Sequence, residues 1–129
     1  MRPRPVVVWL RNDLRLADHR ALAAAVATGA PLVFVYILDD ETPGAWKRGA
    51  ASRWWLDKSL AALDGALRAR GGRLTLRRGA ATQVLPRLVA DCDAQAVYFT
   101  RAYEPHAVAV EDILKVTFDA VGVAFKRFG

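Results

Sequence analysis

Residues 6–15 are Val6-Val7-Val8-Trp9-Leu10-Arg11-Asn12-Asp13-Leu14-Arg15. The first five side chains form an unbroken apolar run, which is typical of a parallel strand buried on both faces of a sheet. The polar residues that follow predict a loop at the carboxyl end of this strand. A helical pattern then runs from Asp18, a predicted helix cap, to Gly29, so the segment predicts the start of a strand–helix alternation.

The same alternation continues along the whole chain of 129 residues, the length of one domain. Strands are expected at 6–10, 32–37, 74–77, 96–99 and 123–128, and helices at 18–29, 50–70, 82–88 and 105–122. The first, second and fourth strands are wholly apolar, as central strands are, whereas the third and fifth contain polar residues typical of sheet edges. The sequence therefore predicts a Rossmann-like three-layer α/β sandwich, with a five-stranded parallel sheet of order 3-2-1-4-5 and helices on both faces.

This topology also predicts where a ligand binds. In open α/β sheets, ligands lie beyond the carboxyl ends of the strands, where the strand order reverses. The reversal falls between the first and fourth strands, so the flanking loops are 11–17 and 100–104, with the loop 38–49 beside them. Any site is expected in the crevice between these segments, the crevice loops.

Composition narrows the class of protein. No apolar run approaches the roughly 18 residues that span a bilayer, and no secretory signal is visible, so a cytoplasmic protein without a membrane segment is expected. The single cysteine, Cys92, agrees with a reducing compartment. Lys and Arg number 19 against 13 Asp and Glu, which permits contact with a polyanion without proving it. An arginine cluster, interpreted as a solvated face, comprises Arg68, Arg70, Arg73, Arg77 and Arg78.

Several kinds of site are not supported. No G-x-G-x-x-G motif follows the first strand, and the glycine spacing at 44–49 is followed by Ala50-Ala51 where a P-loop needs Lys and Ser or Thr. His19 and His106 each begin a different helix and are expected to be exposed, so with Cys92 they do not form a metal site.

The aromatic residues of the long helix suggest an interface. Its core stripe is Leu56, Leu60, Leu63 and Leu67. Trp55 lies on the flank of that stripe and is expected at the core edge. Trp54 points nearly opposite, so it is expected to be exposed and to cover a cofactor or a second domain. In the last helix, the predicted core stripe is Val110, Ile113, Leu114, Thr117 and Val121.

Three charged residues of the crevice loops have two interpretations each. Arg11 and Asp13 either form a salt-bridged loop or hold a ligand, with Asp13 accepting from a ring N–H and the arginine binding an anionic tail. Glu104 either meets the positive end of the last helix or accepts hydrogen bonds from a ligand.

Several ordered motifs resemble those of the DNA photolyase/cryptochrome family, and together they cover nearly the whole chain. They are Val7-Val8-Trp9-Leu10-Arg11-Asn12-Asp13-Leu14-Arg15-Leu16-Ala17-Asp18, Val35-Tyr36-Ile37-Leu38-Asp39, the helix segment Trp55 to Asp64, Arg77-Arg78-Gly79 and Tyr103-Glu104-Pro105. The resemblance implies that residues 1–129 are the family's N-terminal α/β antenna domain. The helical C-terminal domain, which binds FAD, is then expected to be absent from this chain, which would be inactive in repair by itself.

The resemblance also implies a function. In photolyases the antenna passes light energy to reduced FAD, which donates an electron to a cyclobutane pyrimidine dimer in UV-damaged DNA. Expected partners are therefore that DNA, through the full-length protein, and the FAD domain, in a monomer. The alternatives are a cryptochrome-type photoreceptor, a stand-alone nucleotide- or flavin-binding module, and a structural domain with an empty crevice.

The expected antenna is methenyltetrahydrofolate, with 8-hydroxy-5-deazaflavin or FMN as alternatives. Glu104 matches the family's folate-contacting glutamate, and Trp46 falls near a folate-contacting histidine. Leu38, Asp39 and Asp40 stand where the backbone lines the deazaflavin or flavin pocket. Thr100 and Ala102 depart from the asparagine and aspartate that the family has at these positions.

Overall fold

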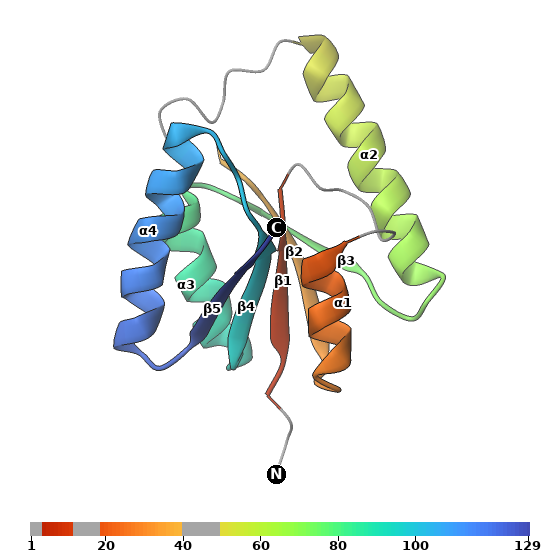
Figure 1. The fold of residues 1–129 in the computed structure, drawn as a ribbon. Helices are drawn as coiled ribbons and strands as arrows, with labels where there is room; N and C mark the ends of the chain where they lie inside the picture. Colours follow the sequence, from red (N-terminus) through yellow and green to blue (C-terminus); the bar gives the residue numbers. More distant parts are fainter. Residues whose placement is uncertain (1–3, 12–18, 40–49) are drawn as a thin grey trace.

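The computed structural model describes residues 4–11, 19–39 and 50–129, with side chains in the second helix described from Trp54 onward. The elements are β1 (Val6–Leu10), α1 (Arg20–Ala27), β2 (Leu32–Leu38), α2 (Ala50–Arg68), β3 (Leu74–Arg78), α3 (Ala81–Cys92), β4 (Ala96–Thr100), α4 (Pro105–Ala120) and β5 (Ala124–Phe128). Strands and helices alternate throughout, as the sequence predicts, and Figure 1 shows the sheet between two layers of helices.

The five strands form one sheet of order β3-β2-β1-β4-β5, with every neighbouring pair parallel. The predicted order is confirmed. In β1, Val6 pairs with Leu32 of β2 on one side and with Ala96 of β4 on the other. All five residues of β1 are buried because the strand is central and helices cover both its faces.

Each face of the sheet has its own core. Helices α3 and α4 cover one face, where Leu85, Leu114 and Phe118 pack against alternate residues of the central strands. Helices α1 and α2 cover the other face, where Ala21 and Leu63 belong to the second core. The strands run parallel, so all their carboxyl ends meet at one edge of the sheet, which is the edge that the topology predicts for a site.

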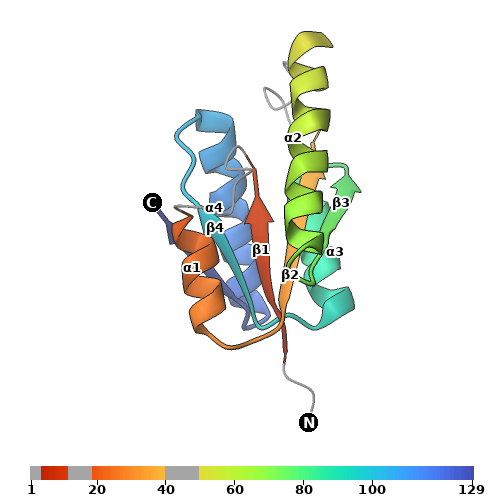
Figure 2. The same ribbon diagram turned by 90° about the vertical axis from the view of Figure 1, so that its right-hand side faces the viewer.

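Helix α2 extends past this edge. Figure 2 shows its N-terminal turns rising beyond the strands, while its later turns lie against the sheet. Leu56, Leu63 and Leu67 are buried, which confirms three members of the predicted stripe. Trp55, expected at the core edge, is 65% exposed, although its neighbour Leu56 belongs to the second core, so Trp55 lies on the solvent side of the helix. That prediction is wrong.

Two further expectations need correction. His19 is buried, not exposed, because its ring caps α1: Nδ1 accepts a hydrogen bond from the Leu22 amide at 3.0 Å. His106, in the first turn of α4, is half-buried. Asp18, the predicted cap of α1, lies outside the described residues.

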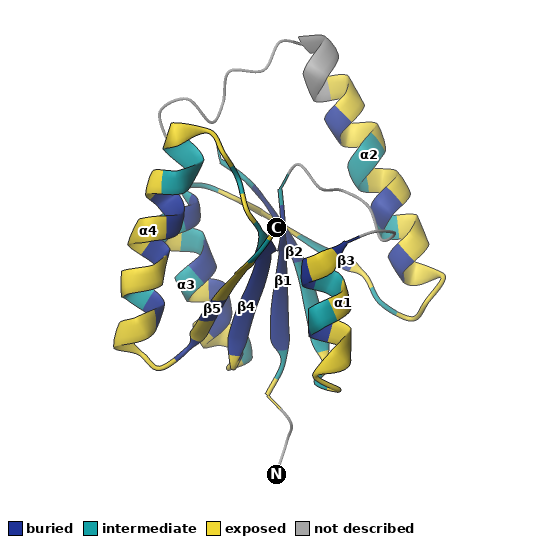
Figure 3. Cartoon of the chain, viewed as in Figure 1, coloured by how far each residue is buried: buried dark blue, intermediate teal, exposed yellow. Residues whose placement is uncertain are grey.

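The core stripe of α4 is also displaced from the predicted one. Val110 and Leu114 are buried as expected, but Ile113 and Val121 are exposed. The remaining buried side chains of this helix are Glu111 and Phe118. The helix therefore turns a face containing a charged residue toward the sheet (Figure 3).

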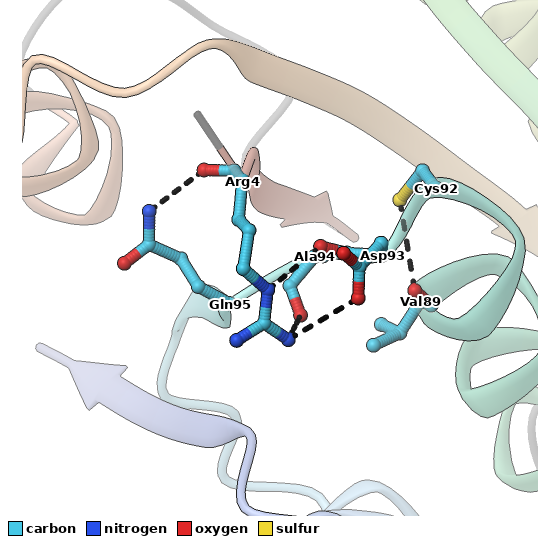
Figure 4. A network of polar contacts seen from close by, with 6 residues as sticks. All are labelled: Arg4, Val89, Cys92, Asp93, Ala94 and Gln95. Atoms are coloured by element: carbon cyan, nitrogen blue, oxygen red, sulfur yellow. Dashed lines mark hydrogen bonds and ion pairs between the residues drawn. The ribbon is translucent and has the colours of Figure 1, made fainter. Parts of the chain in front are cut away.

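At the edge of the sheet where the amino ends of the strands lie, residues before β1 contact the loop between α3 and β4. Figure 4 shows Arg4 donating to the backbone oxygens of Asp93 and Ala94, both at 3.2 Å, with its guanidinium 3.4 Å from the Asp93 carboxylate. The side-chain amide of Gln95 donates to the Arg4 carbonyl at 2.7 Å. These contacts fix the amino end of β1 far from the crevice loops.

Candidate functional site

The candidate site is the carboxyl edge of the sheet, where β1 and β4 end side by side. Arg11 follows β1, Thr100 ends β4, and Glu104 immediately precedes α4. Leu38 ends the neighbouring strand β2 and Asp39 follows it. Asp13, Asp40 and Trp46, the other predicted ligand-binding residues, lie outside the described residues.

Arg11 is held by the protein itself. Its Nη2 donates to the carbonyl oxygen of Thr100 and lies 2.8 Å from Glu111 Oε2, while its side chain is only 17% exposed. The guanidinium carbon also lies 4.5 Å from the Trp9 ring centroid and 5.4 Å from that of Phe99, which are cation–π distances. Arg11 thus joins β1 to β4 and α4, which is the structural interpretation of this residue. A contact of Arg11 with an anionic ligand stays a prediction.

Glu111 is the centre of this network. It is 1% exposed, and its Oε2 accepts from Arg11 at 2.8 Å and from the Ala102 amide at 3.3 Å. Its Oε1 forms an ion pair with Arg127 Nε of β5, 2.8 Å away. A buried carboxylate requires such partners because desolvation of an unpaired charge is costly. Sequence reasoning missed Glu111. The available signal was its spacing of three and seven residues from Leu114 and Phe118, which places a glutamate on the apolar stripe of α4.

Asp39 and Leu38 join the end of β2 to the turn between β3 and α3. The Asp39 carboxylate accepts from the Ala81 amide, the first residue of α3, at 3.3 Å. The carbonyl of Leu38 accepts from the Gly79 amide at 3.0 Å. Both predicted residues therefore lie at the crevice edge, and an oxygen of each accepts a hydrogen bond from a backbone amide.

Glu104 differs from these residues. It is exposed, has extended backbone angles as the N-cap of α4, and makes no side-chain capping hydrogen bond. Its position is close to the positive end of the helix dipole, which attracts negative charge. Among the predicted site residues that the structure describes, Glu104 is the one whose carboxylate faces solvent instead of bonding to the backbone of a neighbouring strand or turn.

The two tryptophans of α2 add an exposed aromatic surface. Trp54 is 53% exposed, which confirms that it faces away from the core. The ring centroids of Trp54 and Trp55 are 5.2 Å apart in an edge-to-face arrangement, and Lys58 Nζ lies 4.7 Å from the Trp54 centroid. Adjacent exposed apolar side chains of this kind mark a candidate interaction surface. What covers them stays a prediction.

Within the described ranges, no group of three His, Cys, Asp or Glu side chains is arranged to hold a metal ion. None of the helices described is both long enough and apolar enough to cross a bilayer.

The sequence matches the family model of DNA photolyase over residues 6–129. The chain belongs to the DNA photolyase family. A deoxyribodipyrimidine photo-lyase of Agrobacterium fabrum is 41% identical over 124 residues, which are 96% of this chain and 25% of that protein. Cryptochrome-1 of Arabidopsis thaliana is 36% identical over 123 residues, 95% of this chain and 18% of that protein.

A solved photolyase confirms the fold. The photolyase of the archaeon Sulfolobus tokodaii, solved with two FAD molecules and reported to imply a novel light-harvesting cofactor, superimposes with a TM-score of 0.87 at 25% identity. The superposition covers 96% of this chain and 29% of that one. The chain thus spans about a quarter of its photolyase relatives, and it corresponds to the N-terminal α/β domain of the family.

Proposed function

We propose that the chain is the light-harvesting N-terminal domain of a deoxyribodipyrimidine photolyase. The family match over residues 6–129 and the 41% identical Agrobacterium photolyase support this proposal. In the full-length protein, an antenna in this domain supplies energy to FAD in a helical C-terminal domain, and the flavin repairs cyclobutane pyrimidine dimers in UV-damaged DNA. The 129 residues alone are then inactive in repair, and the full-length protein acts as a cytoplasmic monomer.

The observation that carries the antenna site is the carboxylate of Glu104. It is exposed beside the strand-order reversal and makes no capping bond with α4. A carboxylate with unoccupied lone pairs fits an antenna whose ring offers N–H donors. Methenyltetrahydrofolate is the antenna we propose, with 8-hydroxy-5-deazaflavin or FMN as alternatives. Leu38 and Asp39 form the neighbouring wall, where the Gly79 amide holds the Leu38 carbonyl and the Ala81 amide holds the Asp39 carboxylate.

When bound, the antenna absorbs near-UV or blue light; the residues of this chain bind and orient it. Glu104 supplies the polar contact. Arg11, which contacts Thr100 and Glu111, sets the position of the β1 and β4 ends. Trp54 and Trp55 supply aromatic surface above the sheet edge, for the antenna or for the helical domain.

The experiment is a titration of the chain with methenyltetrahydrofolate, followed by the absorption and fluorescence of the chromophore. Glu104→Gln keeps the size of the side chain but removes its charge, and we expect it to weaken binding by about tenfold or more, the usual value of a hydrogen bond to a charged group. Asp112→Asn is the control, because Asp112 is an exposed carboxylate on the same helix. Equal affinity of Glu104→Gln and the unmodified chain removes Glu104 from the site.

A cryptochrome-type photoreceptor is the second candidate, favoured by the 36% identity to Cryptochrome-1. Both candidates contain the same antenna domain, so binding to this chain does not separate them. Light-dependent repair of a dimer-containing oligonucleotide by the full-length protein does. Repair supports the photolyase, and its absence in a protein with bound FAD supports the photoreceptor. A stand-alone binding module is supported if the reading frame encodes no helical domain, and a structural domain is supported if the chain binds none of the proposed antennas.

A further inference from the structure

Glu104 belongs to a short segment, residues 101–104, that joins β4 to α4 (Figure 1). On the helix side, the Glu104 carbonyl accepts hydrogen bonds from two amides of the first turn of α4, both at 3.0 Å. On the strand side, the Ala102 amide donates to Oε2 of Glu111 at 3.3 Å. A single residue, Tyr103, separates these two held points. The position of Glu104 therefore depends on both of them.

Glu111 is able to hold this segment because its own carboxylate is fixed. The side chain is 1% exposed, and Oε2 lies 2.8 Å from Nη2 of Arg11. The same Arg11 nitrogen donates to the carbonyl oxygen of Thr100, the last residue of β4. Together, Glu111 and Arg11 contact the backbone just before the segment, at Thr100, and within it, at Ala102.

The two oxygens of the Glu111 carboxylate contact different elements. Oε2 contacts Arg11 and the segment 101–104, whereas Oε1 forms an ion pair with Arg127 Nε of β5 at 2.8 Å. Compared with apolar side chains of similar volume, a buried ion-pair network adds little net stability, because desolvation of the charges offsets their attraction. What the network adds is a fixed position of Oε2, the oxygen that holds the segment.

We propose that Glu111 is a positioning residue for the antenna site, which holds residues 101–104 so that the Glu104 carboxylate meets the antenna in one orientation. An acceptor that is already in place loses less conformational freedom when the ligand binds. Glu111 is buried and acts through Glu104, without contacting the antenna itself. This inference rests on the proposed function and adds to the site a residue that lies outside the crevice loops.

A double-mutant cycle tests whether Glu111 acts through Glu104. Methenyltetrahydrofolate is titrated into the 129-residue chain, Glu111→Met, Glu104→Ala and the double variant. Methionine keeps a similar volume but removes both carboxylate oxygens, and we expect it to weaken binding by about tenfold. In the Glu104→Ala background, the same change should weaken binding by less than about twofold, because the contact that Glu111 positions is already absent. Equal losses in both backgrounds would overturn the proposal.

Glu111→Gln provides a second, milder variant. Its amide keeps one oxygen that is able to accept from the Ala102 amide, so its affinity should lie between those of the unmodified chain and Glu111→Met. We expect a loss of about threefold, since a neutral acceptor is weaker than a charged one. If Glu111→Met does not fold, Glu111→Gln takes its place in the cycle. No loss of affinity in Glu111→Gln would then overturn the proposal.

Arg127→Gln is the matched control. It breaks the ion pair at Oε1 of the same carboxylate and leaves both contacts of Oε2 in place. We expect it to change the affinity for methenyltetrahydrofolate by less than about twofold, whatever its effect on the stability of the fold. If Arg127→Gln loses as much affinity as the Glu111 variants, stability and not the held segment determines binding, and the proposal is wrong.

Hydrogen exchange separates this inference from the antenna function. If the chain binds no antenna, the proposed function fails, but exchange of the Ala102 amide is measurable without a ligand. Relative to the amides of β1, exchange at Ala102 should be about tenfold faster in the Glu111 variants, because the amide loses a charged acceptor. Arg127→Gln should leave it unchanged. Equal exchange at Ala102 in the unmodified chain and the Glu111 variants would overturn the positioning role, with or without an antenna.

Discussion

Arg11 Nη2 lies 2.8 Å from Oε2 of Glu111, so the residue after the central strand is paired with a carboxylate that is 1% exposed on the last helix. One hundred residues of sequence separate the two. Arg127 forms an ion pair with the other carboxylate oxygen, so one buried glutamate pairs with the arginine that follows β1 and with an arginine of β5. The pair sets the relative positions of β1, β4 and α4 where the crevice opens.

Removal of the Glu111 carboxylate should therefore lower the free energy of unfolding. Glu111→Ala leaves the mostly buried Arg11 without its counterion, and loss of one partner of a buried pair typically costs about 3–5 kcal/mol. We expect that loss in the free energy of unfolding measured with urea. Asp112→Asn, at the exposed neighbouring position, should change it by less than about 0.5 kcal/mol. A loss below about 1 kcal/mol in Glu111→Ala would contradict the central role of this residue.

The carboxyl group of Asp64 should make the stability of the fold depend on pH. The Leu74 amide and the Arg68 guanidinium donate to its carboxylate at 2.9 and 2.8 Å, and these hydrogen bonds hold the pKa of Asp64 below its ordinary value. A lowered pKa in the folded state stabilises the fold above the unfolded pKa, near 4, and this stabilisation is lost as pH falls through the folded value.

Asp64→Asn should therefore have a lower urea midpoint than the unmodified chain at neutral pH, and the difference should shrink as pH falls below about 4. Asp57→Asn, an exposed carboxylate on the same helix, is the control. A difference between the Asp64 variant and the unmodified chain that stays constant from pH 7 to acid would show that the carboxylate does not act through its charge.

Replacement by alanine should lower the stability of the fold at one glycine and raise it at another. Gly79 has φ +130°, and an added Cβ would meet Val84 Cγ2 at 3.0 Å, so Gly79→Ala should cost about 1–3 kcal/mol of stability. Gly65 lies inside α2 with open space around it, so Gly65→Ala should add up to about 1 kcal/mol. Thermal or urea unfolding of both variants tests the pair. Stabilisation by Gly79→Ala would show that the turn does not have this conformation.

Cys92 should react slowly. Partial burial raises the pKa of its thiol, so the fraction present as thiolate near neutral pH is smaller than for a free cysteine. We expect its reaction with a disulfide reagent at pH 8 to be slower than that of a short cysteine peptide. Unfolding in urea should bring the two rates together. Equal rates in the folded state would mean that the thiol is fully solvated.

The fold was predictable because its determinants are local. The unbroken apolar run of β1 and the mixed pattern of β3 and β5 are visible within each strand, and together they order the sheet. Glu111 and His19 were not predictable in the same way. Glu111 is buried against Arg11, which only the folded chain brings to it. His19 is buried because its ring caps α1. Trp55 was misplaced because helical periodicity identifies the centre of a buried stripe, here Leu56, but does not decide whether its flank is covered.

The candidate site divides along the same line. The topology alone identified the sheet edge and the loops that contain Arg11, Asp39 and Glu104. Which of these residues already has a partner in the protein depends on contacts distant in sequence. Arg11 bonds to Thr100 and Asp39 bonds to Ala81, whereas Glu104 faces solvent. Asp13, Asp40 and Trp46 lie outside the described residues, so their predicted roles remain predictions.

The central claim is that this domain binds a light-absorbing antenna, and equilibrium titration tests it most directly. The purified chain is titrated separately with methenyltetrahydrofolate, 8-hydroxy-5-deazaflavin and FMN, and the absorption of each chromophore is followed to saturation. The account predicts saturable one-to-one binding of one chromophore, methenyltetrahydrofolate first, accompanied by quenching of the fluorescence of Trp54 and Trp55. No saturable binding of any of the three at micromolar protein would contradict it and would favour a structural domain with an empty crevice.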